Sequence, residues 1–68
     1  MSVARVTEVI SSSTESFDDA IKSGIARASE TLDNITSAWV QDQKCVVDNG
    51  SISEYRVAMK ITFVLNEK

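Results

Sequence analysis

The chain has no histidine, one cysteine and two glycines among its 68 residues, and each shortage removes a class of site. Without histidine, the usual Ser-His-Asp and Cys-His nucleophile systems and histidine metal sites are excluded. Cys45 has no second cysteine, which excludes an intrachain disulfide and a structural zinc site. Gly24 and Gly50 lie far apart, so the chain has no glycine-rich phosphate loop.

Positive charge and long apolar runs are also scarce. Seven Lys and Arg residues face ten carboxylates, and the resulting net charge of −3 argues against nucleic-acid binding. No apolar run approaches membrane-spanning length, and the N-terminal segment is too short and too polar for a signal peptide. We therefore expect a cytoplasmic protein that binds neither nucleic acid nor membrane.

The length predicts one domain, residues 1–68, with a small core. Domains of this size usually need a disulfide, a metal or a partner subunit for stability. Because the disulfide and the structural zinc site are excluded, we expect a homo-oligomer.

The clearest pattern predicts one amphipathic helix from Ser13 to Asn34. Ser12 or Ser13 is expected to cap it, with Glu15 at capping-box spacing from Ser12. A mid-helix glycine is unfavourable, so close packing is expected at Gly24. The apolar stripe recurs at steps of three and four: Phe17, Ala20, Ile21, Gly24, Ile25, Ala28 and Leu32.

The remaining segments read as strands, over Val3–Ile10, Thr36–Val47 and Ser51–Leu65. The Asp48-Asn49-Gly50 sequence predicts a hairpin with a two-residue loop between the last two. The fold class is therefore α+β, in the order β-α-β-β. The third strand is expected between the other two, in a sheet that wraps the helix.

This hairpin register places Val40 opposite Met59 on the helix side of the sheet. It also pairs Trp39 with Lys60, Ala38 with Ile61, Gln43 with Arg56 and Gln41 with Ala58. Nothing in the chain covers the other sheet face. That face is predicted to carry Ser37, Trp39, Gln41, Gln43, Cys45, Ile52, Glu54, Arg56, Ala58, Lys60 and Thr62.

Trp39 is the residue on this face with the clearest binding potential. Its indole, beside amides and cations, suits the stacking of a planar heteroaromatic ligand, or else an anchor in a subunit interface. Asp18 and Asp19 are adjacent on the helix and splay apart, so an enzyme is not expected. The Asp48–Glu54 segment lacks the EF-hand pattern, and a calcium ion shared between subunits remains open.

The segments RVTEVISSSTESFDDAIKSGIARASETLDNI and EYRVAMKITFVL, joined by an extended strand, resemble the dodecin family across essentially the whole chain. The resemblance implies a β-α-β-β fold and a hollow homododecamer. It also implies flavin storage, with the ring sandwiched between Trp side chains and a Gln at its edge. In this sequence Ser37 stands at the family's Trp position and Arg56 at its Gln position. Replacement of both resembles a calcium-dodecin-like branch.

These observations favour a homododecameric binding and storage protein for a flavin: riboflavin, FMN or FAD. Trp39, Ser37, Gln43 and Arg56 are the predicted binding residues, with Trp39 about 6.6 Å along the strand from Ser37. The alternative is a shell that binds Ca²⁺, through metal ligands that the sequence does not identify, or has a purely structural role.

Overall fold

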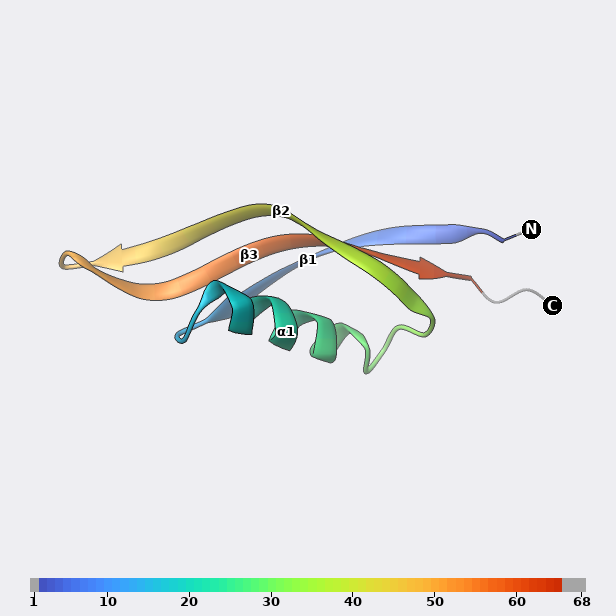
Figure 1. Cartoon of the computed structure of the whole chain (residues 1–68), viewed down its shortest axis with the longest axis horizontal. Coiled ribbons are helices and arrows are strands. Elements are labelled where there is room, and N and C mark those ends of the chain that lie inside the picture. The colour runs from blue at the N-terminus through green and yellow to red at the C-terminus, as the bar shows by residue number, and fades with distance from the viewer. Residues whose placement is uncertain (1, 66–68) are drawn as a thin grey trace.

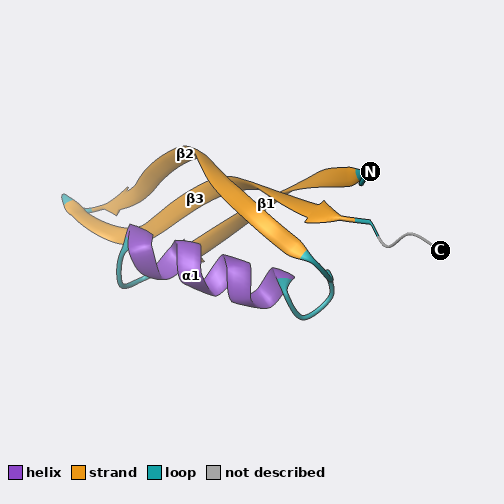
Figure 2. Cartoon of the chain, turned by 45° about the vertical axis from the view of Figure 1, so that its right-hand side comes forward, coloured by secondary structure: helices purple, strands orange, loops and turns teal. Residues whose placement is uncertain are grey.

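The computed structural model describes residues 2–65, which form one helix and three strands (Figure 1). The elements are β1 (Ala4–Ser13), α1 (Phe17–Ala28), β2 (Ile35–Asp48) and β3 (Ser51–Val64). The sheet order is β1-β3-β2 with both pairs antiparallel, so β3 is central, as predicted. Helix α1 lies against one face of the curved sheet (Figure 2), which confirms the predicted α+β architecture.

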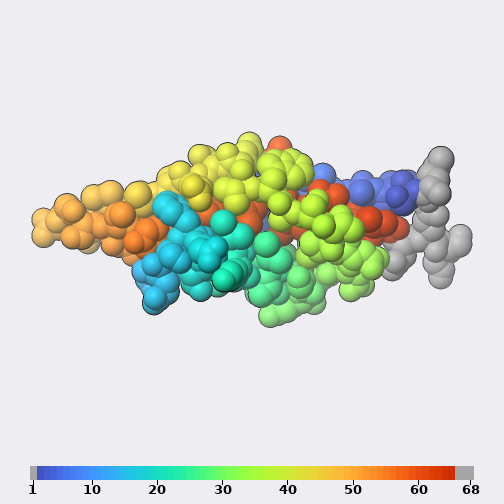
Figure 3. Space-filling view, viewed as in Figure 1, coloured from blue at the N-terminus to red at the C-terminus, as the bar shows by residue number. Residues whose placement is uncertain are grey.

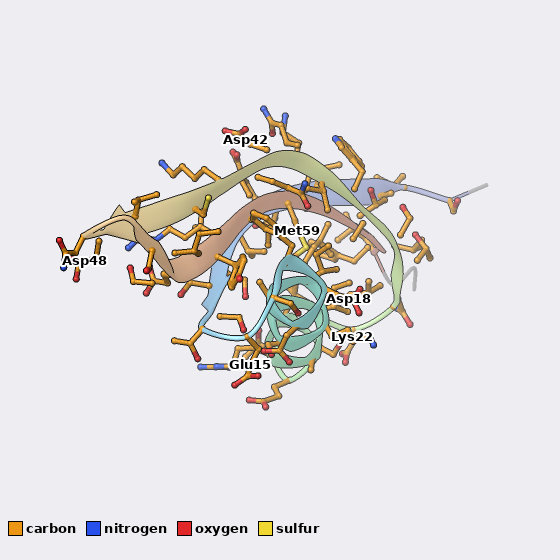
Figure 4. The ribbon with its side chains drawn as sticks, turned by 60° about the vertical axis from the view of Figure 1, so that its left-hand side comes forward. Glu15, Asp18, Lys22, Asp42, Asp48 and Met59 are labelled. Carbon is orange, nitrogen blue, oxygen red and sulfur yellow. The ribbon has the colours of Figure 1, made fainter. Side chains whose placement is uncertain are left out.

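The core lies between α1 and the central strand. Val57, Met59 and Ile61 are fully buried and alternate along β3 with less buried residues, as the period of two predicts. Ala20 and Ala28 of α1 are buried against this side of the sheet. Figure 4 shows Met59 directed from the sheet toward the helix. The predicted helix stripe therefore faces the core.

The helix begins later than the sequence indicates. Its N-cap is Ser16, whose Oγ accepts a hydrogen bond from the Asp19 amide at 2.9 Å, so the expected cap at Ser12 or Ser13 is wrong. Ser13 instead ends β1, where it pairs with Tyr55 of β3. The predicted first strand, Val3–Ile10, thus extends through Ser11, Ser12 and Ser13, because their ladder with β3 satisfies their backbone groups.

The helix also ends earlier, at Ala28 rather than at Asn34. Tight turns follow, in which the amides of Glu30 and Thr31 donate to the carbonyls three residues before them. Asn34, the predicted last residue of the helix, has a left-handed φ of 65° and lies directly before β2. No helix within residues 2–65 has the length and apolar character needed to cross a membrane.

The β2–β3 hairpin turns through the predicted two-residue loop. Asp48 pairs with Ser51, and Asn49 and Gly50 have φ of 53° and 82°, the positive values of a type I′ turn. The hairpin reaches well beyond α1 along a longest dimension of 54 Å. It forms the narrow end of the space-filled molecule (Figure 3).

The register of β2 on β3 follows the prediction only in part. Val40 opposite Met59, Trp39 opposite Lys60 and Ala38 opposite Ile61 are confirmed. The strand then bulges at Gln41, and beyond it Asp42 pairs with Ala58 and Gln43 with Val57. The predicted pairs Gln41–Ala58 and Gln43–Arg56 are wrong. A bulge inserts one unpaired residue and bends the strand, here around the helix.

Candidate functional site on the outer sheet face

The sheet face opposite α1, hereafter the outer face, is the surface on which the predicted site lies. Partners across a ladder share a face, so the two registers define rows that cross all three strands. Asp42 extends on the side of the sheet away from the helix (Figure 4). From one end, the rows are Val6–Thr62–Ser37, Glu8–Lys60–Trp39, Ile10–Ala58–Asp42 and Ser12–Arg56–Lys44.

Trp39 remains accessible on this face. It is 48% exposed in the isolated chain and lies directly opposite Lys60, whose row also holds Glu8. Ser37, in the next row, pairs with Thr62. The indole of Trp39 thus lies beside the small hydroxyl side chain of Ser37, and the cationic Lys60 lies opposite it on the neighbouring strand.

Arg56 occupies the last of these rows. Its side chain is 46% exposed, and its Nε donates to Oε1 of Glu54 at 2.7 Å. Arg56 and Lys60 are four positions apart in β3, a distance of about 13 Å along the strand. Ser37, Trp39 and Arg56 are therefore on one face, but Arg56 lies at some distance from the indole.

Gln43 does not lie with the other three. The bulge places it opposite the buried Val57, on the helix side of the sheet, where it is exposed beyond the reach of α1. Cys45, also expected on the outer face, pairs with Tyr55 on the helix side. The expectation that Gln43 and Cys45 share a face with Trp39 is thus wrong.

The bulge brings Asp42 and Lys44 to the outer face in their place. Sequence reasoning missed both residues. The polar run Gln41-Asp42-Gln43-Lys44 contains no apolar residue whose burial would fix which side faces the core. Only the flanking valines, Val40 and Val46, constrain which side of this run faces the core.

A small pocket of about 130 Å³ opens beside these residues. Ile10, Val57 and Ala58 supply its apolar part. Its charged groups are those of Asp42, Lys44 and Arg56. A larger groove, about 510 Å³, runs between β1 and α1 and includes Gly24 and Arg27. The small pocket is lined by all three members of the row that follows Trp39 on the outer face, Ile10, Ala58 and Asp42.

Large apolar side chains are unusually accessible on the outer face. Val6 and Ile10 are 52% and 74% exposed, in addition to the half-exposed Trp39. Exposed apolar patches on small proteins commonly mark sites of association or ligand binding. This face is therefore suited to contact with an apolar partner.

The acidic side chains of residues 2–65 do not gather into a metal centre within one chain. No group of three or more Cys, Asp or Glu side chains in residues 2–65 is placed to hold an ion. Asp18 pairs with Lys22 at 3.3 Å, and Asp19 accepts a hydrogen bond of 2.7 Å from the buried Ser13 hydroxyl. Both carboxylates of the first helical turn thus have local partners within the fold.

Comparison with known proteins agrees with the fold and covers nearly the whole chain. The family model described as Dodecin matches residues 3–66. A calcium dodecin from Mycobacterium tuberculosis is 32% identical over 63 residues, which are 93% of this chain and 89% of that protein.

Solved structures give the same result. The dodecin from Streptomyces davaonensis superposes with a TM-score of 0.93 at 38% identity, covering 97% of each chain. The structure of the Mycobacterium tuberculosis calcium dodecin, described with a calcium-binding site, has a TM-score of 0.82 at 30% identity, covering 97% of this chain and 94% of that one. Sequence and structure together show that the chain belongs to the dodecin family.

Proposed function

We propose that this chain is one subunit of a cytoplasmic homododecamer that binds and stores a flavin-class ligand, and that it is not an enzyme. The observation that carries the proposal is the half-exposed indole of Trp39 on the sheet face opposite α1, which no helix or strand of residues 2–65 covers. Family membership supports it, because dodecins are small binding proteins.

The residues around Trp39 fit a planar heteroaromatic ring. Stacking of such a ring on an aromatic side chain contributes about 1–3 kcal/mol per stacked face. Ser37, at the position where flavin-binding dodecins carry their Trp, has a side chain small enough to leave room beside the indole. Lys60, directly opposite, can donate to a carbonyl at the ring edge.

A second copy completes the site in this proposal. One indole covers one face of a flat ligand, and a symmetry-related indole would cover the other. The exposed Val6 and Ile10 beside it supply apolar surface that the isolated chain leaves in water. Ligand binding and assembly are thus expected to use the same face.

A fluorescence titration of riboflavin with the purified oligomer tests the proposal. Saturable quenching of the flavin by the wild-type protein, lost in Trp39→Ala, is the expected result. Trp39→Phe is the matched variant, because it keeps an aromatic face and should retain part of the binding. Quenching that is unchanged in Trp39→Ala would contradict this site.

Calcium binding is the second candidate, favoured by the 32% identity to a calcium dodecin. Because no chelating group of three acidic side chains lies within residues 2–65 of one chain, the ion would need carboxylates from more than one copy. Calcium should then raise the melting temperature of the oligomer, and a chelator should reverse the rise. An unchanged melting temperature at millimolar calcium would contradict this candidate.

A further inference from the structure

Asn49 and Gly50 form the exposed tip of the β2–β3 hairpin. Both residues are exposed, and apart from the chain neighbours of Gly50 no heavy atom lies within 4 Å of the position that a Cβ on Gly50 would occupy. The tip lies beyond the end of α1 (Figure 1), at the narrow end of the molecule. Solvent therefore reaches both residues of the turn.

Two neighbouring groups in this turn are not held by hydrogen bonds. The side-chain amide of Asn49 makes no hydrogen bond with any of residues 2–65, and the N–H of Gly50 donates to no backbone carbonyl of these residues. The ladder closes with the pair Asp48–Ser51, so the Gly50 amide lies outside it. A carboxamide and the backbone nitrogen of the next residue can therefore approach each other.

We propose that Asn49 is a site of spontaneous covalent modification, at which its link to Gly50 converts to an isoaspartyl linkage. The backbone nitrogen of Gly50 attacks Cγ of Asn49, so that a new C–N bond forms and the Cγ–Nδ2 bond breaks. The departing nitrogen takes up the proton that Gly50 loses and leaves as ammonia. Water then opens the cyclic imide. Its attack at the former side-chain carbonyl gives aspartate, and its attack at the main-chain carbonyl gives isoaspartate, with no transfer of electrons in either step.

A glycine after the asparagine favours this attack. Gly50 has no Cβ to obstruct the approach of its nitrogen to the Asn49 carboxamide, and its backbone rotates freely. Ring closure requires rotation about the Cα–C bond of Asn49, away from the geometry of the turn. Loop tips open locally at little cost in free energy, so the exposed end of the hairpin permits this rotation.

Asn34 provides a comparison within the same chain. It is also exposed and also has a positive φ, of 65°. However, its Nδ2 donates to the carbonyl of Val64 at 3.3 Å, and the next residue is Ile35, which begins β2 and pairs with Phe63. A β-branched residue that is held in a ladder hinders attack by its own nitrogen. The modification should therefore be specific to Asn49.

The isoaspartyl linkage changes the hairpin as well as its charge. It runs through the former side-chain carbonyl, which places an additional carbon in the backbone of the two-residue loop. The type I′ geometry that aligns Asp48 with Ser51 is then lost. Both hydrolysis products also add a carboxylate next to Asp48. The end of the hairpin should thus loosen as the protein ages.

The test is incubation of the purified oligomer at mildly alkaline pH, followed by digestion and mass spectrometry of the peptides that contain Asn34 and Asn49. Asn49 is expected to lose its amide about tenfold faster than Asn34 or more, because attack by the glycine nitrogen has the lower barrier. The rate should rise with pH, since the attacking nitrogen must lose its proton. Methylation by an isoaspartyl methyltransferase distinguishes isoaspartate from aspartate.

Asn49→Gly is the matched variant, because Gly-Gly also adopts the type I′ turn but carries no carboxamide. Its melting temperature should stay constant through the incubation, whereas that of the wild type should fall as isoaspartate accumulates. Equal rates at Asn49 and Asn34 would overturn the proposal. Retention of the Asn49 amide in the folded protein, under conditions in which the chain unfolded in urea loses it, would do the same.

Discussion

The Cε atom of Met59 lies 2.6 Å from the position that a Cβ on Gly24 would occupy. The Cβ of Ser11 lies 2.9 Å from the same point. Real Cβ atoms essentially never approach other heavy atoms this closely, so Gly24 allows α1 to contact β1 and β3 together. Met59 is fully buried and has no open solvent into which its methyl group can move.

Gly24→Ala should therefore destabilise the protein, although alanine is the better helix former. Overpacking of a core costs about 1–3 kcal/mol, against a gain of about 1 kcal/mol in helix propensity. We expect a net loss of about 1 kcal/mol, seen as a melting temperature lower by roughly 4–8 °C. Thermal melting at a fixed protomer concentration measures it, since an oligomer's stability depends on concentration.

Ala26→Gly provides the comparison, because Ala26 is an exposed residue of the same helix. That change measures the glycine penalty without any packing term and should cost about 1 kcal/mol. A Gly24→Ala protein that melts above the wild type would show that the contact with Met59 relaxes freely, contrary to the geometry.

The hydroxyl of Ser16 is the second local contact with a measurable contribution. It caps α1 by accepting from the Asp19 amide at 2.9 Å. Ser16→Ala should lower the free energy of unfolding by about 1 kcal/mol, because a first-turn amide loses its partner. Thr14→Ala, at an exposed position in the same loop, should have little effect. Equal effects of the two changes in thermal melting would contradict the assigned cap.

The sequence was sufficient to predict the architecture, because the spacing of its apolar residues indicates which side of each helix or strand is buried. Val57, Met59 and Ile61 alternate along β3, and the structure buries all three. The Asn49-Gly50 turn was equally predictable from the sequence, since few other residue pairs adopt two positive φ values. The close approach at Gly24 followed from the cost of a glycine within a helix.

The site was only partly predictable, since it depends on a bulge. A bulge at Gln41 reverses the faces of residues 42–46, and a second register shift before Val47 restores the predicted pairing. The polar run that follows Val40 contains no apolar residue that would indicate the reversal. Gln43 was therefore expected on the outer face, where Asp42 and Lys44 lie instead. The prediction of the helix cap was wrong for a related reason. The ladder with Tyr55 extends β1 through Ser12 and Ser13, which the sequence indicated as helix caps.

The bulge leads to a prediction about deletions. Removing Gln41 should leave Val40 opposite Met59 and Asp42 opposite Ala58, because Gln41 is the unpaired residue. Removing Thr7 breaks the alternation within the regular β1–β3 ladder, which has no bulge to absorb the loss, and forces neighbouring side chains to the wrong face. Deletion of Gln41 should thus lower the melting temperature much less than deletion of Thr7. The reverse order, with matching far-UV circular dichroism, would refute the assigned bulge.

The apolar part of the outer face makes a prediction about assembly. Ile10 is 74% exposed, so Ile10→Asp removes almost no packing within one chain and should leave the fold intact. If copies of the chain meet through this face, the change places a charge in a desolvated interface, which is costly without a partner. The mass of the assembly, measured by light scattering, should then fall, with circular dichroism unchanged.

Ala26→Asp serves as the matched control, because it adds the same charge at an exposed position on α1, away from the outer face. This variant should keep the wild-type mass at the same protomer concentration. An Ile10→Asp protein with the full mass would show that subunits meet elsewhere, leaving Trp39 accessible to ligands from one side only. The two-sided stacking proposed for Trp39 therefore requires the Ile10 variant to dissociate.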